Sequence, residues 1–555
     1  MVPGSDRSLE AASAHSPSSA EESEWPEILV VGGGLGGIAA ALAAAELGAR
    51  VLLTEESAWL GGQLTSQGVP PDENGLIETI GGTGTYRRLR RGIRAYYRDH
   101  QKLTQAAARS SFLNPGNAHV SRIAHEPRAA LAAIDELCAP LLASGRMRIR
   151  RGWTPVSASS EADAVRSVTF STADGDLITV EPSYVLDATE DGGLLDLVGC
   201  EHVLGSEAQT DTGEPRALTG AADPLDQQAI TWCLAVEHRP GERHEIGKPA
   251  DYDMWRAYRP DFWPGPLLSF TGCNPHTPRE AITWPLFAEP GGWSLWTYRR
   301  IRDGSLHDPA TSDISILNWP QNDYFVDPVV GVTPEQREAR LAAARNLSLS
   351  LLYWLQTEAP RSDGGTGYPE LAPAANVFGT ADGLALRPYL REGRRIQAVT
   401  TVVEQDIAFD SRPDGPLQFA DSVGVGHYRI DLHPSTGGRN YIDFAAHPFQ
   451  VPLGALIPIR LRNLLPAAKN IGSTHITNGC YRLHPVEWTI GEAAGALAAF
   501  CLRHNVQPGQ VQATAALTEQ LQSILTDKFD TTLRWPTDYT EGYIAGEVAK
   551  RRERS

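Results

Sequence analysis

The sequence contains no apolar segment long enough to cross a membrane and no cysteine spacing that marks a metal or redox site. Even residues 38–47 fall short of the roughly 20 apolar residues that span a bilayer, and they include Glu46. The six cysteines form no C-x-x-C pair, and no H-E-x-x-H motif occurs, which argues against a disulfide scaffold and a zinc site. We therefore expect no membrane span, no metal, and reduced thiols in a cytoplasmic protein.

Basic charge is also scarce. The chain has 49 Lys and Arg against 67 Asp and Glu, a formal net charge of −18, which would repel a phosphate backbone and disfavours nucleic acid as a partner. Residues 1–24 are rich in Ser, Ala and Glu and lack a basic start followed by an apolar run. We expect a disordered tail there rather than a secretory signal.

A βαβ unit begins directly after this tail. Residues 28–31 are an apolar strand, 32–37 a glycine-rich turn, 38–47 an Ala/Leu helix and 50–55 a second strand. In Gly32-x-Gly34-x-x-Gly37, the three glycines suit a tight turn, close approach of a pyrophosphate, and close helix–strand packing. Glu55 ends the second strand, where a carboxylate can bind ribose hydroxyls. The alternative, a structural turn, is disfavoured by this context.

The segment after Glu55 favours FAD over NAD. An NAD fold usually continues into further alternating units, whereas residues 56–65 form a second glycine turn around Gly61 and Gly62. Isoalloxazine-binding loops occupy this position in flavoproteins. No second G-x-G-x-x-G βαβ unit follows, which disfavours a dedicated nicotinamide domain.

Further strands are expected at 147–151, 180–189 and 463–468, with a helix at about 486–504. Between them, about 207–380 is rich in Pro, Trp and loop signals, as expected of an inserted domain. The predicted fold class is α/β, with a discontinuous Rossmann-like FAD-binding domain and an inserted α+β substrate domain. The expected parts are the FAD-binding domain at 25–205 (with a helical insertion at about 70–125) and 381–505, the aromatic-rich domain at 206–380, and a helical tail at 506–555.

Several blocks together carry a family resemblance: residues 59–69, 113–117, 187–192, 389–396, 431–433 and 464–495. With them, the chain resembles the FAD-dependent oxidoreductase family of the glutathione-reductase/fumarate-reductase type. The sequence departs from the family pattern in two places. Gly393 stands where Ser is expected, and the segment Lys469-Asn470-Ile471-Gly472 replaces the residues usual there in the family.

The resemblance implies FAD as cofactor, with NAD(P)H or oxygen as further co-substrates. It implies an enzyme that oxidises or reduces a small organic molecule by hydride transfer at flavin N5, between the FAD domain and the aromatic-rich domain. The alternatives are a flavin monooxygenase that uses NAD(P)H and oxygen, or a non-catalytic FAD-binding subunit. The implied cofactor contacts are Gly32, Gly34, Leu35, Gly36, Gly37, Glu55, Glu56, Gly62, Gln63, Leu64, Val156, Ala188, Thr189, Glu190, Gly472 and Glu487.

Histidines are the first candidates for moving a proton. His484 precedes the last helix of the FAD domain, after residues 479–482, which we expect to be non-helical. The resemblance implies that this helix points at the flavin, and an ordinary imidazole pKa near about 6.5 suits a proton carrier. His433, beside Asp431, and His475 are further candidates. For each, the alternative is a structural histidine.

Two arginine clusters receive different interpretations. Arg391, Arg394 and Arg395 fall in a family block, and a guanidinium can bind carboxylate, phosphate or the flavin C2=O. We expect at least one functional arginine there, with Arg391 preferred as a catalytic residue. By contrast, residues 87–91 carry four arginines on a helical stretch and predict a basic surface helix.

Six tryptophans fall between residues 255 and 319: Trp255, Trp263, Trp284, Trp293, Trp296 and Trp319. Such rings can line a substrate pocket, but buried tryptophans more often form a domain core, which is the favoured interpretation. Cys480 lies four residues before His484, close to the expected flavin position.

Overall fold

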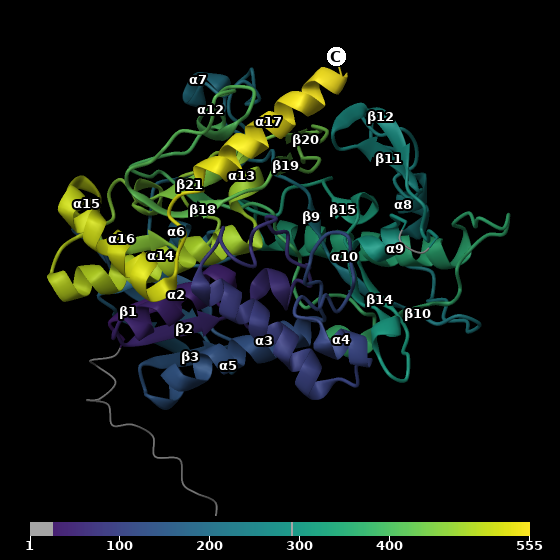
Figure 1. The fold of residues 1–555 in the computed structure, drawn as a ribbon, viewed down its shortest axis with the longest axis horizontal. Coiled ribbons are helices and arrows are strands. Elements are labelled where there is room, and N and C mark those ends of the chain that lie inside the picture. The colour runs from purple at the N-terminus through teal and green to yellow at the C-terminus, as the bar shows by residue number, and fades with distance from the viewer. Residues whose placement is uncertain (1–25, 290–291, 555) are drawn as a thin grey trace, which may run out of the picture.

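The protein is described from a computed structural model that covers residues 26–289 and 292–554. The tail predicted at 1–24 lies outside the described residues. A five-stranded parallel sheet, ordered β22-β7-β1-β2-β3, forms the centre of one half of the molecule (Figure 1). Its strands are β1 (Ile28–Val31), β2 (Val51–Glu55), β3 (Met147–Arg151), β7 (Tyr184–Asp187) and β22 (Leu464–Pro466). The sheet therefore joins segments from both ends of the chain, and the fold class is Rossmann-like α/β.

The two faces of this sheet are covered by different layers. Because side chains alternate along a strand, Ile28 and Val30 of β1 enter one core with the helices, whereas Leu29 and Val31 enter another. That second core contains Val168 of an antiparallel meander. The helices are α2 (Leu35–Glu46), α3 (Gly84–His100), α5 (Pro127–Ala143) and α14 (His484–His504), and the meander is β4 (Thr154–Glu161), β5 (Ala164–Ser171) and β6 (Leu177–Val180).

Helices α2 and α14 approach each other at glycines. A Cβ at Gly491 would lie 1.9 Å from the carbonyl oxygen of Gly36, and one at Gly495 would lie 2.1 Å from that of Ala40. Both distances are far below van der Waals contact, so neither position tolerates a side chain without separating the helices. This crossing places the first turn of α14 beside the first turn of α2.

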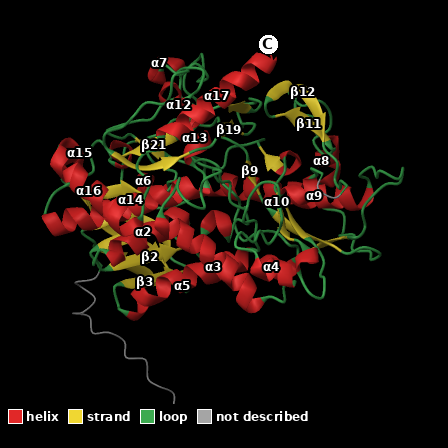
Figure 2. Cartoon of the chain, in the orientation of Figure 1, coloured by secondary structure: helices red, strands yellow, loops and turns green. Residues whose placement is uncertain are grey.

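The inserted half is built on an antiparallel sheet, ordered β13-β14-β10-β16, and the long helix α10 (Pro334–Thr357), seen at the right of Figure 2. Its strands are β10 (Leu234–His238), β13 (Arg300–Arg302), β14 (Ile314–Leu317) and β16 (Leu371–Pro373). Five of the six tryptophans are buried in this half and belong to its core, whereas Trp293 is 40% exposed. The interpretation of this cluster as a domain core is thus the one the packing supports.

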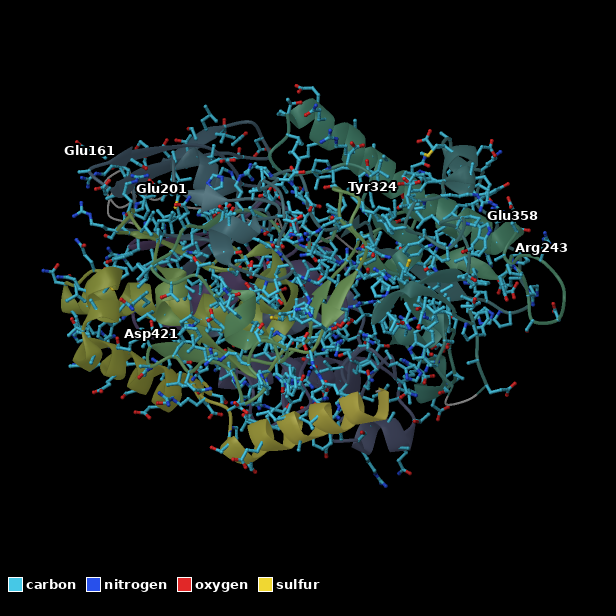
Figure 3. All side chains as sticks on the ribbon, turned by 90° about the horizontal axis from the view of Figure 1, so that it is seen from above. Glu161, Glu201, Arg243, Tyr324, Glu358 and Asp421 are labelled. Carbon is cyan, nitrogen blue, oxygen red and sulfur yellow. The ribbon has the colours of Figure 1, made fainter. Side chains whose placement is uncertain are left out.

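Further strands and helices complete the two halves. Figure 3 shows the described side chains from above, with Glu161 and Glu201 at one end of the molecule and Arg243 and Glu358 at the other. The short strand pairs are β8 (His202–Val203) with β17 (Arg395–Ile396), β9 (Ile230–Thr231) with β15 (Asp323–Tyr324), β11 (Thr271–Asn274) with β12 (Thr277–Thr283), β18 (Ser422–Gly426) with β21 (Phe449–Pro452), and β19 (Ile430–Leu432) with β20 (Ile442–Phe444). The remaining α-helices are α4 (Gln105–Arg109), α6 (Gly193–Leu197), α7 (Gln209–Thr212), α8 (Tyr252–Ala257), α9 (Leu295–Tyr298), α11 (Ala375–Phe378), α12 (Glu404–Ile407), α13 (His475–Tyr481), α15 (Pro508–Ala513), α16 (Ala515–Phe529) and α17 (Thr537–Arg554). The 3-10 turns are η1 (Gly62–Leu64), η2 (Gly304–Leu306), η3 (Pro320–Asn322) and η4 (Leu453–Leu456).

Three local predictions are corrected. The strand expected at 180–189 is divided, because β6 ends at Val180, Pro182 intervenes, and β7 begins at Tyr184. Residues 479–481 are helical, because the Thr474 side chain caps the start of α13. The basic segment at 87–91 is helical, but it is only partly a surface helix, because Arg88 and Arg91 are exposed whereas Arg87 and Arg90 are buried.

Ion pairs explain why two of these arginines are buried. Arg87 and Arg90 are 7% and 2% exposed. Arg90 pairs with Glu73 and Glu78, and Arg87 lies 2.7 Å from Asp530. The ion pairs of Arg90 therefore form an internal ionic layer, whereas Arg87 pairs with the exposed Asp530.

Candidate functional site

The glycine-rich loop between β1 and α2 forms the floor of a cavity, and each glycine of the motif has a distinct geometric reason. A Cβ at Gly32 would lie 2.2 Å from the carbonyl oxygen of Ala188, and one at Gly37 would lie 1.9 Å from that of Gly32. These two glycines allow strand and helix to pack. A Cβ at Gly34 would meet a side-chain oxygen of Glu190 at 2.8 Å. Gly34 lines the cavity, so its missing side chain keeps that wall open.

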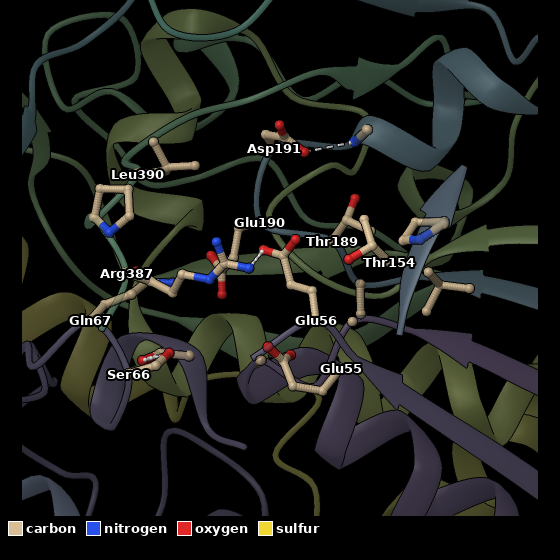
Figure 4. Close-up of a pocket in the computed structure, with 18 of the residues that line it drawn as sticks. Glu55, Glu56, Ser66, Gln67, Thr154, Thr189, Glu190, Asp191, Arg387 and Leu390 are labelled. Atoms are coloured by element: carbon tan, nitrogen blue, oxygen red, sulfur yellow. Dashed lines mark hydrogen bonds and ion pairs between the residues drawn. The ribbon is translucent and has the colours of Figure 1, made fainter. Parts of the chain in front are cut away.

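The cavity has a volume of about 440 Å³ and lies at the carboxyl ends of β1, β2 and β7, the edge at which α/β sheets bind their ligands. Figure 4 shows its labelled side chains pointing into a common space. Arg337 and Leu341 of α10 line the cavity from the inserted half. Among the predicted cofactor contacts, its walls contain Gly32, Gly34, Glu55, Glu56, Gly62, Ala188, Thr189 and Glu190.

Two acidic residues mark the β2 side of this cavity. Glu55 accepts hydrogen bonds from the backbone N–H groups of Gly33 and Ser57, both at 2.8 Å. Burial raises the pKa of Glu55, although these bonds oppose the rise. Glu56 is exposed and forms a 2.7 Å ion pair with Arg387, drawn as a dashed line across the cavity in Figure 4.

The opposite end is a buried polar cluster below the first turn of α14. Gln63 donates to Glu487, Lys469 pairs with Glu190, and the Gly36 N–H lies 3.4 Å from Glu487 Oε1. Burial raises the pKa of Glu487 to about 7, while Lys469 acts to lower it. One positive charge thus faces two carboxyl groups next to the glycine loop.

The other predicted cofactor contacts lie at different depths. Leu35, Gly36 and Leu64 are buried beside the glycine loop. Val156 is 44% exposed, just beyond the cavity residue Pro155. A Cβ at Gly472 would lie 2.4 Å from the carbonyl oxygen of Thr400, so this glycine serves backbone packing.

The chemistry of the cavity fits a flavin dinucleotide. The open wall at Gly34 and the N–H groups at the start of α2 suit a pyrophosphate. Glu55 suits an adenosine ribose. Gln63, Gln67 and Glu190 each bury a side-chain oxygen without a partner, and such acceptors require donors, as the ribityl hydroxyls and flavin N3–H would provide.

A second cluster lies where the halves meet, and it joins two predicted catalytic residues. Arg391 Nη2 lies 2.9 Å from Asp323 Oδ1, and His433 Nδ1 lies 2.6 Å from Asp323 Oδ2. Thr231 Oγ1 donates to the same carboxylate at 2.5 Å. Burial alone would raise the pKa of Asp323, but Arg391 and His433 lower it below its usual range. Asp323 is therefore an ionised carboxylate held between a guanidinium and an imidazole.

Asp323 and Thr231 were not predicted from the sequence. They reach this cluster through the short pairing of β9 with β15, in which Thr231 lies opposite Asp323. Neither residue stands in a recognisable motif. The only local signal is the short polar break at residues 321–323 after an apolar strand.

His484 is completely buried, and its environment differs from the one assumed from the sequence. The Asp72 N–H donates to Nδ1 at 3.2 Å. Burial, together with Arg299 and Arg482, lowers the pKa of His484 well below the ordinary imidazole value. The expected titration near neutral pH is therefore wrong for this residue.

The other candidates are structural in their contacts. His475 Nδ1 lies 2.8 Å from Glu392, and both side chains are at most 2% exposed. Arg395 pairs with Glu207, and Arg394 pairs with Asp196 at the cavity wall. Cys480 is buried and donates to the Thr477 carbonyl at 3.3 Å, and burial raises its pKa.

Comparison with protein families decides the identity. A family model described as FAD dependent oxidoreductase matches residues 27–525. The chain belongs to this family. FAD is therefore the cofactor of this FAD dependent oxidoreductase, and the protein is an oxidoreductase enzyme whose subclass the family leaves open.

Solved structures give only distant matches to this FAD dependent oxidoreductase. A geranylgeranyl bacteriochlorophyll reductase-like protein from Thermoplasma acidophilum is 11% identical, with 91% of this chain and 84% of that chain covered and a TM-score of 0.31. A myxobacterial chondrochloren halogenase is 10% identical, with 90% and 79% covered and a TM-score of 0.32. In two other matches this chain spans 39% and 23% of the solved protein. No curated protein matches.

Within the described residues of this FAD dependent oxidoreductase, no helix has the length and apolar character needed to cross a membrane. The described His, Cys, Asp and Glu side chains form no group of three that could hold a metal ion.

Proposed function

We propose that this FAD dependent oxidoreductase exchanges a hydride between a small organic substrate and N5 of its flavin, where the FAD-binding half meets the aromatic-rich half. Bound FAD supplies the two-electron chemistry, and oxidation of the substrate releases a proton together with the hydride. The protein must therefore provide a base for that proton, and reduction uses the same group in reverse.

The pair of His433 and Asp323 carries this proposal. In a neutral imidazole, Nδ1–H donates to the Asp323 carboxylate and Nε2 keeps the lone pair that accepts a proton. The His433 side chain is 18% exposed, whereas Asp323 is fully buried. A buried carboxylate fixes the ring and stabilises the imidazolium that forms. His433 is thus suited to act as a base.

A continuous set of contacts links this pair to the cofactor cavity. Leu390 lines the cavity, and its neighbour Arg391 holds Asp323. On the other side, Arg482 donates to the Asp431 carbonyl at 3.1 Å and accepts a hydrogen bond from Gln63 through its own carbonyl. These contacts connect His433 to the residues that fit the flavin through Arg482 and Asp431 on one side and through Arg391 and Asp323 on the other.

The remaining histidines suit this role less well. His484 Nδ1 already accepts a hydrogen bond and its pKa is lowered, and His475 is 2% exposed beside Glu392. His484 thus has no free lone pair on Nδ1, and His475 is enclosed. We therefore propose His433 rather than His484 as the base.

Anaerobic bleaching of the flavin tests the proposal. The holoprotein is mixed with amines, alcohols, amino acids and sugars, and then with NADH and NADPH. Bleaching by an organic donor is expected. His433→Gln should keep its flavin and slow bleaching about a hundredfold, whereas His276→Gln, on an exposed hairpin, should not.

Bleaching by NADH or NADPH alone would refute the proposal and support the monooxygenase alternative. Failure of every donor would support a non-catalytic subunit. An unchanged rate in His433→Gln would remove the assigned base. A cytoplasmic location, a small-molecule substrate and the absence of nucleic-acid or membrane partners remain predictions.

A further inference from the structure

A set of buried hydrogen-bond donors without acceptors lies beside the proposed base. Arg299 follows α9, and its side chain is 9% exposed. Its Nη2 lies 4.0 Å from the nearer oxygen of Asp72, a loose ion pair, and its guanidinium lies over the ring of Tyr298. Its Nε and Nη1 have no hydrogen-bond partner at all. The N–H groups of a buried guanidinium normally all have hydrogen-bond acceptors. Two N–H groups without one therefore indicate that a ligand supplies the acceptor.

His484 adds a third donor. Because the Asp72 N–H donates to Nδ1, this nitrogen carries the lone pair, and the neutral ring bears its proton on Nε2. Burial and the two arginines favour the neutral ring by lowering its pKa. Nε2 is buried and makes no hydrogen bond of good geometry, although the Val69 backbone carbonyl interacts with the ring and acts to raise its pKa. In the neutral ring, His484 Nε2 is therefore a hydrogen-bond donor in a fixed position and does not act as a base.

Arg482 adds the fourth donor without an acceptor. Its Nη1 donates to the Tyr389 hydroxyl at 2.6 Å and its Nη2 to the Asp431 carbonyl at 3.1 Å. Its Nε is buried and unpaired. Asp72 connects the set, because its backbone binds His484 and its carboxylate interacts with both arginines.

All four unpaired atoms are donors, and they come from three residues that act on one another electrostatically. A carboxylate offers about four acceptor positions on two oxygens, whereas a ketone or amide oxygen offers two. Planar guanidinium groups match carboxylate geometry in particular. Asp72 and Asp431 already balance the positive charges of Arg299 and Arg482. The ligand is therefore recognised by its hydrogen-bond acceptors and not by its net charge.

We propose that Arg299, Arg482 and His484 bind the carboxylate group of the substrate, which makes the substrate a small organic acid. This inference rests on the proposed function, since it concerns the same site. The acid would be held on the Asp431 side of His433, whose Nε2 lies 3.9 Å from Asp431.

Titration of the oxidised holoprotein tests this assignment. Acetate, propionate, benzoate and succinate are compared with the matching amides by calorimetry and by perturbation of the flavin spectrum. Carboxylates should bind, and amides should not. Arg299→Met and Arg482→Met should weaken carboxylate binding about thirtyfold or more, with FAD retained. Arg243→Met, at the outer end of the molecule in Figure 3, is the matched control and should bind normally.

Equal binding of acids and amides, or no binding of any acid, overturns the assignment. So does unchanged affinity in Arg299→Met. If Arg299→Met and His484→Gln lose FAD instead, the donors serve the cofactor and the assignment is overturned. Arg299→Lys guards against misfolding, because it keeps the charge and should retain part of the affinity. Calorimetry needs no turnover, so a protein that binds acids but is never bleached would refute hydride transfer and leave this assignment standing.

Discussion

His433 Nδ1 lies 2.6 Å from Asp323 Oδ2, and the same carboxylate lies 2.9 Å from Arg391. One buried carboxylate thus joins a cation that is permanently charged to an imidazole that can change its charge. Removing its charge should affect the two partners differently: Arg391 loses its counter-ion, and His433 loses the group that stabilises its protonated form.

Asp323→Asn should lower kcat about a hundredfold and shift the pH profile of the reaction, because the imidazolium form of His433 is no longer stabilised. Steady-state rates against pH measure this effect. Thr231→Val is the control, since it removes one hydrogen bond to Asp323 and leaves the His433 contact. A fall in stability without a change in the pH profile would show that Asp323 only supports the fold.

Gly34→Ala and Gly37→Ala should separate cofactor binding from packing. The added Cβ at Gly34 meets the carboxyl ends of the Glu190 and Glu487 side chains, but no backbone, and faces the cavity. FAD affinity should therefore fall about tenfold or more with the apoprotein Tm unchanged. At Gly37 the Cβ would lie 1.9 Å from a backbone oxygen, and the fold should lose about 1–3 kcal/mol. Equal Tm values for both variants would contradict this division.

Glu492 on α14 should make stability depend on pH. It is 1% exposed, its Oε1 accepts from Thr531 at 3.0 Å, and burial raises its pKa from 4.5 to about 7. Between these values the folded protein keeps a proton that the unfolded chain releases. The free energy of unfolding therefore falls as pH rises through this window, by at most about 3 kcal/mol, and stays low above it.

Glu492→Gln removes this titration, so its stability relative to the unaltered protein should increase between pH 5 and pH 8. Urea unfolding at both pH values measures the change. The control is Glu519→Gln, at an exposed position. Parallel pH dependence of Glu492→Gln and the unaltered protein would contradict the assignment.

Arg90→Met and Arg91→Met compare neighbours on α3. Arg90 is buried between Glu73 and Glu78, so its loss leaves Glu73 without a cation and Glu78 with Arg94 alone, and it should cost about 3 kcal/mol or more. Arg91 is exposed, and its replacement should change stability by less than about 0.5 kcal/mol. Thermal unfolding distinguishes them, and equal Tm values would restore the surface-helix interpretation.

Local patterns predicted the parts of the fold that depend on neighbours in the chain. The glycine motif, β1 and β3 lie where the sequence placed them, because turn chemistry and apolar runs act over a few residues. The helix at 479–481 was missed because its start depends on a cap at Thr474. Arg90 was misplaced because the carboxylates that bury it lie 12 and 17 residues away.

The catalytic cluster was only half predictable. His433 and Arg391 stood in recognisable blocks, but Asp323 lies 110 and 68 residues from them and has no motif of its own. Only the tertiary pairing of β9 with β15 brings it between them. Likewise, no sequence pattern reveals that the His484 environment suppresses its protonation, because that follows from burial and from the distant Arg299 as well as from the neighbouring Arg482.

The crossing of α2 and α14 affects the order of events during synthesis. The Gly36–Glu487 contact joins residues 451 positions apart, and β22 completes the sheet beside β7 only when residues near 464 have been made. A ribosome must therefore release most of the chain before the cofactor cavity can close. Until then β7 presents an open edge, so truncation before β22 should leave a chain that needs chaperones and cannot hold flavin.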